Sequence, residues 1–209
     1  AAFLEREDPR DAFLSLNAPT LAELPPGSVI GSASLRRQAQ ILNRRPDLKV
    51  TLLRGNVQTR LGKLADGVVD ATLLAYAGLR RLGLADKASA VLSPEEMLPA
   101  VGQGAIGITC RADDTRVLDW LAAINHAETQ IRVTAERALL AALDGSCRTP
   151  IGGLAEIDGD RLRLRGLVAR EDGSEMFETE RNGAVADAVA LGDDAGRELR
   201  GRAGDDIFG

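Results

Sequence analysis

Three short segments carry residues whose types and spacing could do chemistry. The first, Gly31–Gln38 (GSASLRRQ), runs from a predicted strand into a predicted helix. A helix N-terminus attracts anions through its free N–H groups and its dipole. Ser32 and Ser34 add hydroxyl donors, and Arg36 and Arg37 add two positive charges. The segment therefore favours a carboxylate or phosphate site. The alternative is a serine-capped helix with two solvated arginines.

The second segment is Leu52–Arg60 (LLRGNVQTR), in which Arg54 ends a predicted strand and Arg60 lies one turn into the next helix. The carboxyl ends of strands in open α/β sheets meet at one crevice, where ligands bind. The planar fork of arginine binds carboxylates bidentately. The chain has 23 Arg and 3 Lys, so arginines that merely cover the surface are the alternative.

The third segment is Leu143–Gly153 (LDGSCRTPIGG), with Cys147 between Ser146 and Arg148. A neighbouring cation favours the thiolate, which makes Cys147 a candidate for covalent attachment. The alternative is that it is a small buried hydrophobic residue, as isolated cysteines usually are. That second role is the one we expect for Cys110, at the end of an apolar stretch.

Composition excludes several classes of protein. The 209 residues are 44% hydrophobic and 27% charged with a net charge of -5, which indicates a globular protein of one or two domains. Only 3% are aromatic and there is no basic excess, so we expect no nucleic-acid partner. The apolar stretch Ala71–Leu79 is too short for a membrane span. One histidine (His126) and two cysteines outside any CxxC motif argue against a metal site. We expect a cytoplasmic protein with free thiols.

The first half of the chain alternates strands and helices, which predicts parallel βαβ units covered on both faces. Predicted strands lie at Ser28–Gly31, Lys49–Leu53, Asp70–Ala75 and Ala88–Leu92, and predicted helices at Ser34–Arg45, Asn56–Ala65 and Gly78–Leu84. A Pro/Gly-rich linker, Ser93–Gly104, follows.

The second half is expected to form a small α+β domain. After a strand at Ala105–Cys110 and a helix at Thr115–Ile124, a long helix is predicted at Ala127–Leu143, with Asn125 and Glu128 as a capping box. Its predicted apolar stripe is Ile131, Ala135, Ala138 and Ala142. Three strands and a final helix are predicted at Ile151–Ile157, Arg161–Ala169, Glu175–Arg181 and Ala184–Arg202. Asp-Gly turns join the strands as hairpins.

Taken in order, these segments resemble hydroxymethylbilane synthase, the porphobilinogen deaminase family. The similarity spans essentially the whole chain. The matching blocks are EREDPRDAFLS (Glu5–Ser15), GSASLRRQAQ (Gly31–Gln40), RRPDL (Arg44–Leu48), LRGNVQTRLGKL (Leu53–Leu64), AGLRRLGL (Ala77–Leu84), LPAVGQGAIGI (Leu98–Ile108), NHAETQIRVTAERA (Asn125–Ala138) and GSCRTPIG (Gly145–Gly152).

The resemblance implies an α/β fold. It has doubly wound domains like those of periplasmic binding proteins, followed by a small C-terminal α+β domain with a three-stranded antiparallel sheet. Residues 1–16 and 99–124 would be the remnant of domain 1. Residues 17–98 would form domain 2, which binds carboxylates, and residues 125–209 domain 3, which carries the cofactor attachment loop.

The resemblance also implies a function. The family joins four porphobilinogen molecules head to tail into hydroxymethylbilane, releases ammonia at each step, and works as a monomer on a covalent dipyrromethane cofactor. The thioether cysteine maps to Cys147. Residues implied to bind the cofactor are Ser34, Arg36, Arg37, Arg54 and Arg60, and those implied to bind the substrate or growing polypyrrole are Arg81 and Gln103. Ala33 stands where many members have Ser or Thr, so one hydroxyl contact is not carried over.

One departure from the family concerns catalysis. The chain begins where the family is about to leave its first domain, and no acidic residue here matches the motif of the family's catalytic aspartate. We therefore expect a fragment with no catalytic residue of its own. Two alternatives remain open at this point. One is an anion-binding lobe without a covalent cofactor, and the other is a partner subunit that lends its arginines to another chain.

Overall fold

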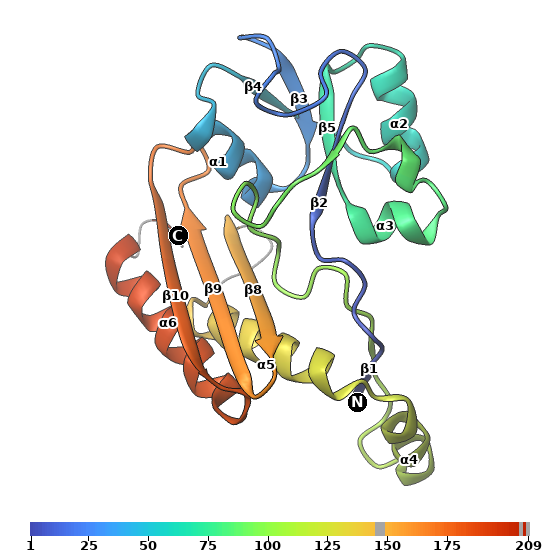
Figure 1. Ribbon diagram of the computed structural model, residues 1–209, viewed down its shortest axis with the longest axis vertical. Helices are drawn as coiled ribbons and strands as arrows, with labels where there is room; N and C mark the ends of the chain where they lie inside the picture. Colours follow the sequence, from blue (N-terminus) through green and yellow to red (C-terminus); the bar gives the residue numbers. More distant parts are fainter. Residues whose placement is uncertain (145–148, 205–206, 208–209) are drawn as a thin grey trace.

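Two β-sheets of different construction organise the chain (Figure 1). The computed structural model describes residues 1–144, 149–204 and 207. A five-stranded sheet has the order β4-β3-β5-β2-β6, and a three-stranded sheet has the order β10-β9-β8. The strands of the first sheet are β2 (Asp11–Ser15), β3 (Val29–Ser32), β4 (Lys49–Leu52), β5 (Ala71–Ala75) and β6 (Ala90–Val91). Those of the second are β8 (Ile151–Asp158), β9 (Arg161–Ala169) and β10 (Met176–Ala184).

The five-stranded sheet contains the predicted parallel unit. Strand β3 pairs in parallel with both β4 and β5. Side chains alternate between two cores: Phe13, Ile30 and Leu73 lie on one side, and Leu14 and Leu74 lie on the other. Helix α1 (Leu35–Arg44) packs into the first core, whereas α2 (Val57–Ala65) and α3 (Tyr76–Arg81) pack into the second. Both faces of the sheet are therefore covered, which explains why its central strands are apolar on both sides.

Strand β2, like the short strand β1 (Ala2–Phe3), was not predicted by the sequence analysis. It pairs antiparallel with β5 on one side and with β6 on the other, so it lies inside the sheet. Its first four residues, Asp11–Leu14, are all buried. The run DAFLS opens with an acid and is only five residues long, which weakens the usual strand signal.

The three-stranded sheet confirms the predicted antiparallel hairpins. Strand β9 pairs antiparallel with β8 and β10. Gly159 and Gly173 occupy positive φ values of 59° and 73° in the two turns, a region that favours glycine. Helices α5 (Ala127–Ala142) and α6 (Ala188–Ala203) share one core with this sheet. Two short 3₁₀ helices, at Ala85–Lys87 and Val185–Asp187, complete the connections.

One prediction about helix α5 is wrong and another is incomplete. Its N-cap is His126, whose Nδ1 accepts from the Thr129 amide, and not Asn125. The Asn125 side chain instead accepts a hydrogen bond from the Phe3 amide at 2.9 Å, a partner 122 residues away. The predicted apolar stripe includes the buried Ala135, but Leu139 contributes a fully buried side chain that the stripe omits.

The predicted strand Ala105–Cys110 is also corrected. Only β7 (Gly107–Ile108) forms, and it pairs with β1 (Ala2–Phe3) in a two-stranded ribbon. Cys110 is half-buried and does not lie in a core. A two-stranded ribbon leaves much of its surface uncovered, so apolar residues there cannot all be buried.

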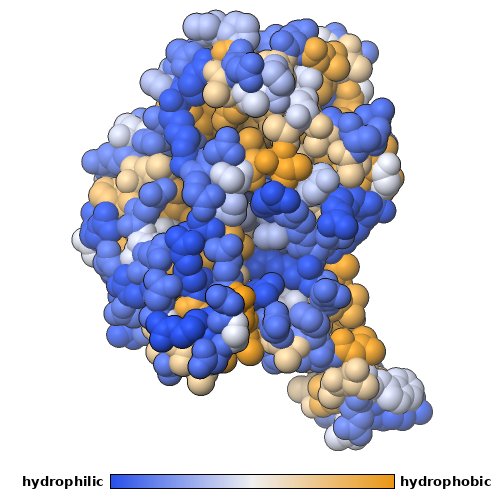
Figure 2. Space-filling view, viewed as in Figure 1, coloured by the Kyte–Doolittle hydropathy of each residue, from blue (hydrophilic) through white to orange (hydrophobic). Residues whose placement is uncertain are grey.

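Helix α4 (Thr115–Ile124) projects from this ribbon, away from both larger sheets (Figure 1). Ile106, Trp120 and Ile124 are exposed there, and the hydrophobic colour beside α4 in Figure 2 marks this part of the surface. No helix in the described part of the chain is long and apolar enough to cross a membrane.

A buried ion pair fastens the connection between β1 and β2 to the second half of the chain. Arg6 donates two hydrogen bonds to the carboxylate of Glu136 in α5. The same carboxylate accepts from the amides of Gly102 at 2.6 Å and Ala155 at 2.9 Å. Glu136 thus joins helix α5 to the N-terminal segment, the linker and strand β8. A buried carboxylate of this kind is tolerated because every oxygen is hydrogen-bonded.

We predict that Glu136→Gln lowers the free energy of unfolding by about 3–5 kcal/mol, because it leaves Arg6 as an uncompensated buried charge. Urea denaturation at pH 7 measures this. The control is Glu128→Gln in the same helix, where the exposed pair with Arg132 is worth about 0.3–0.5 kcal/mol. Equal losses in the two variants would contradict the structural role of Glu136.

Candidate functional site

The N-terminus of α1 is built as the sequence predicts. Ser34 is the N-cap, and its hydroxyl accepts from the amide of Arg37 at 3.4 Å. Its own amide donates to the Ser32 hydroxyl at 3.1 Å. The serine cap fixes the start of the helix just after the end of β3, so the first helical N–H groups, which have no intrahelical partner, lie near the carboxyl end of that strand.

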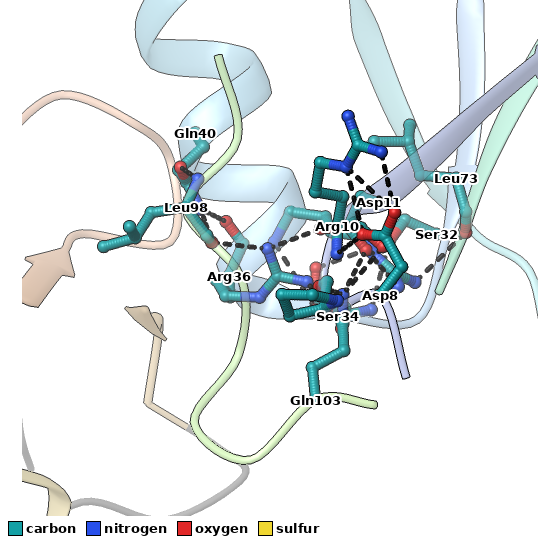
Figure 3. Close-up of polar contacts among 12 residues, drawn as sticks. Asp8, Arg10, Asp11, Ser32, Ser34, Arg36, Gln40, Leu73, Leu98 and Gln103 are labelled. Carbon is teal, nitrogen blue, oxygen red and sulfur yellow. Dashed lines mark hydrogen bonds and ion pairs between the residues drawn. The ribbon is translucent and has the colours of Figure 1, made fainter. Parts of the chain in front are cut away.

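Arg36 and Arg37 are buried, with 4% and 7% of their surface exposed. Both pair with the carboxylate of Asp11, the first residue of β2 (Figure 3). Arg36 Nη1 lies 2.8 Å from Asp11 Oδ2, and Arg37 Nη2 lies 2.7 Å from Asp11 Oδ1. Arg37 also donates to the carbonyl of Leu73 at 3.0 Å. The alternative of two solvated arginines is therefore wrong.

The linker between the two halves completes this cluster. Arg36 donates to the carbonyl of Leu98 at 2.7 Å. Gln103 donates to Asp11 Oδ1 at 3.0 Å and accepts from Arg36 at 3.4 Å. Gln103, predicted as a substrate contact, thus lies beside the arginines and uses its amide to hold them. Figure 3 shows the linker passing beneath the helix start at this point.

Arg60 belongs to the same electrostatic environment. It is half-buried and donates from Nε to the carbonyl of Gly55 at 2.9 Å. Burial, and then repulsion from Arg37, lower the pKa of its guanidinium. Arg37 and Arg60, in the helices that follow β3 and β4, are therefore near enough for their charges to repel, as expected if the carboxyl ends of these strands meet at one crevice.

The other two predicted arginines lie further out. Arg54 is exposed just beyond the end of β4, and the structure gives it no contact with Asp11, Arg36 or Arg37. Arg81 is also exposed and donates to the carbonyl of Gly104 at 2.8 Å. Of the predicted arginines, the structure therefore brings together Arg36, Arg37 and Arg60 only.

The cluster has more positive than negative charge. Burial alone would raise the pKa of Asp11, but the positive charges of Arg36 and Arg37 outweigh burial. The pKa of this carboxyl is therefore below its usual value, and the group is ionised at neutral pH. Burial lowers the pKa of Arg36, and attraction from Asp11 only partly offsets this. One carboxylate thus faces two guanidinium groups, and Arg60 adds a third positive charge on the side of Arg37. Arg36 Nε is buried and has no hydrogen-bond partner among the described residues.

A cavity of about 280 Å³ adjoins the cluster. Its lining joins the start of α1 to the linker and to the beginning of β8. It includes Ser34, Arg36, Val101, Thr149 and Ile151. Cys147 lies outside the described residues, and Thr149 is the first described residue after that gap. The structure describes no cluster of three or more acidic, histidine or cysteine side chains suited to a metal ion.

Two descriptions of known protein domains match this chain. The family description "Porphobilinogen deaminase, dipyromethane cofactor binding domain" matches residues 1–119, more than half of the chain. The chain belongs to the porphobilinogen deaminase family. The description "Porphobilinogen deaminase, C-terminal domain" of the same family matches residues 130–201.

Several relatives named porphobilinogen deaminase are closely similar. Those from Nitrobacter hamburgensis and Paracoccus denitrificans are each 59% identical, and each alignment covers 99% of this chain and 66% of the relative. A chloroplastic porphobilinogen deaminase from Pisum sativum is 56% identical, with 98% of this chain and 57% of the relative covered. The chain thus spans just under two thirds of the length of the first two relatives.

Asp11 is the residue of this site that sequence reasoning missed. It lies in the block EREDPRDAFLS, which was noted only for its resemblance to the deaminase family. The signal available was an acid directly before the apolar run AFL. An acid at a buried strand end needs a cationic partner, and the nearby Arg36-Arg37 pair supplies one.

We predict that Asp11→Asn lowers the free energy of unfolding by about 3–5 kcal/mol, because it leaves two buried guanidinium groups facing each other. Since the folded-state pKa of Asp11 is depressed, its contribution is present above the ordinary value of 3.8 and is lost as pH falls through the folded-state pKa. The difference between wild type and variant should be constant from pH 7 to pH 5.

Urea denaturation at several pH values measures this difference. The control is Asp47→Asn, which removes a surface pair with Arg45 and should change stability little. A difference that already shrinks near pH 6 would mean that the Asp11 carboxyl titrates in the usual range or above it.

Proposed function

We propose that this chain provides the arginine-lined site of a hydroxymethylbilane synthase. This enzyme condenses four porphobilinogen molecules head to tail and releases one ammonia per condensation. The observation that carries the proposal is the buried pair of Arg36 and Arg37 around the single carboxylate of Asp11, with the half-buried Arg60 near Arg37. Its uncompensated positive charge calls for an anionic ligand. Each pyrrole unit of the proposed substrate has two carboxylates, so a growing chain offers a row of them.

The residues at the cavity fit a dipyrromethane group, the cofactor that the matched family domain binds. Arg36 Nε has a free proton in a buried position, and Ser34 keeps a hydroxyl proton to donate while it caps the helix. The first N–H groups of α1 add donors without intrahelical partners. When bound, the cofactor supplies the terminal pyrrole on which the chain is extended. The protein's own groups hold carboxylates in place and exclude competing orientations.

We propose Cys147 as the attachment point, on the strength of its GSCRTPIG block. The cavity lies between the start of α1 and Thr149, two residues beyond this cysteine in sequence. A thioether is stable enough to survive repeated cycles of extension and release. In this proposal Arg54 and Arg81, which are exposed, meet the carboxylates of later pyrrole units.

The domain division is part of the same proposal. Residues 1–16 and 99–124 would belong to a first domain, 17–98 to a second and 125–209 to a third, with the first two like periplasmic binding proteins. A boundary after residue 16 would separate β2 from the five-stranded sheet in which it pairs, so we instead propose that the first two domains meet within Glu5–Arg10, before β2. The cytoplasmic location and the monomeric state of the whole enzyme stay predictions.

Proton transfer at the pyrrole nitrogen needs a positioned carboxylate. Asp11 is occupied by two arginines and is fully buried, so it is not available for that task. We propose that the acid/base group comes from the part of the family's sequence that this chain does not match. The arginine cluster then binds and orients, and the chemistry is completed by that other segment.

We predict that residues 1–209 bind porphobilinogen without releasing ammonia from it. Arg60→Ala should weaken this binding by about ten- to a hundredfold, because a charge-assisted hydrogen bond contributes about 1.5–3 kcal/mol. Isothermal titration calorimetry and an ammonia assay on the same samples measure the two quantities. The control is Lys49→Ala, an exposed cation at the amino end of β4, whereas Arg60 follows the carboxyl end of that strand. Sustained ammonia release by wild type would place the catalytic acid within this chain.

We predict that the intact mass of the natural protein exceeds its sequence mass by a covalently bound dipyrromethane. Cys147→Ser should remove that adduct and leave the fold unchanged, whereas Cys110→Ser should retain it. Mass spectrometry of freshly purified protein, with circular dichroism for the fold, tests this. A bare wild-type mass would favour a binding lobe without a covalent cofactor, and an adduct in Cys147→Ser would refute the assignment.

A further inference from the structure

The turn between β9 and β10 rests on helix α1, although the two segments are about 130 residues apart in sequence (Figure 1). Asn43 Nδ2 donates to the carbonyl of Gly173 at 2.9 Å. Gln38 Nε2 donates to the carbonyl of Glu171 at 3.1 Å. Both bonds join a side chain of α1 to the backbone of the turn, so they depend on where the turn lies rather than on its side chains.

Gly173 is the closest point of this contact. A Cβ added there would lie 2.5 Å from the amide nitrogen of Asn43 and 2.8 Å from the carbonyl carbon of Leu42. These are backbone atoms of a helix, which cannot move aside as the end of a flexible side chain can. Gly159, in the other hairpin turn of the same sheet, also has a positive φ, but a Cβ there would meet nothing within 4 Å.

The turn is held in shape by its own hydrogen bonds. The amide of Gly173 donates to the carbonyl of Arg170 at 2.9 Å. The amide and hydroxyl of Ser174 both donate to Asp172 Oδ1, at 3.0 and 2.6 Å. A turn constrained in this way moves with its sheet, and a helix moves as a rigid rod. The contact therefore transmits the position of the sheet to α1.

The other end of α1 is the candidate site. Ser34 caps the helix there, and Arg36 lies in its first turn. Both line the cavity that is also lined by Thr149 and Ile151, at and just before the start of β8. The three-stranded sheet thus meets α1 at both ends, and Ala39 in the middle of α1 also packs with Leu154 and Leu167 of this sheet. The β9–β10 turn holds its C-terminal end, and the start of β8 faces its N-terminal end across the cavity.

We propose that Gly173 and Asn43 are positioning residues for the carboxylate site, and that the β9–β10 turn is a latch that sets the distance between the start of α1 and the start of β8. The proposal rests on the proposed function, since it assumes that a pyrrole carboxylate is bound at that cavity. Misplacement of binding groups by about 1 Å can cost orders of magnitude in a reaction, so a small shift of α1 matters.

The test compares Gly173→Ala with Gly159→Ala in the full chain. Both variants carry the strain of alanine at positive φ, but only Gly173→Ala forces the turn away from α1. We expect Gly173→Ala to weaken porphobilinogen binding about tenfold and to speed amide hydrogen exchange in α1 and the turn. Gly159→Ala should do neither. Equal effects in the two variants would contradict the proposal that the turn positions α1. Faster amide exchange in Gly173→Ala with unchanged porphobilinogen binding would contradict it as well.

Asn43→Ala keeps the test decisive if Gly173→Ala does not fold. Asn43 is exposed, and alanine has a higher helix propensity than asparagine, so weaker binding could not come from a weaker helix. We expect a loss of about threefold with faster exchange in the turn, and wild-type binding would overturn the proposal. If wild type itself binds no porphobilinogen, the proposed function fails, while the exchange data still report whether the turn holds α1.

Discussion

The carboxylate of Asp11 holds the centre of this structure together. Two guanidinium groups approach it from the first turn of α1, and neither could be buried without a negative partner, because an unpaired charge in the interior is very costly. The arrangement places β2, the start of α1 and the linker around one point. It also leaves the site with more positive than negative charge, which is the property that the proposed substrate requires.

The linker connects this centre to the second half of the molecule. Leu98 and Gln103 contact the arginines, and Gly102, between them, donates to Glu136 in α5. Arg6 completes the connection through its own pair with Glu136. Two buried carboxylates, each satisfied by several donors, therefore fix the relative positions of the five-stranded and three-stranded sheets. Such networks specify one arrangement because any other would leave polar groups unpaired.

Local signals predicted many of the elements but not all of their boundaries or surroundings. Ser34 caps α1, and the two Asp-Gly turns form hairpins, because both features depend on a few adjacent residues. Strand β2 was missed, and Ala105–Cys110 was predicted too long, because the extent of a strand depends on the strands that pair with it. The N-cap of α5 is His126 and not the predicted Asn125, because the Asn125 side chain accepts a hydrogen bond from the distant Phe3 amide.

By itself the sequence determined the family, the alternation of strands and helices, and the placing of arginines near strand ends, since these follow from ordered motifs and hydrophobic periodicity. The tertiary structure decided which arginines share one site and what neutralises them. The sequence alone is consistent with Arg36 and Arg37 as solvent-exposed or ligand-binding residues. In the structure, Asp11, about 25 positions away, pairs with both of them. Arg54 lies only six residues before Arg60 in the same segment, yet it is exposed. Burial and pairing are properties of the folded neighbourhood, and no local pattern encodes them.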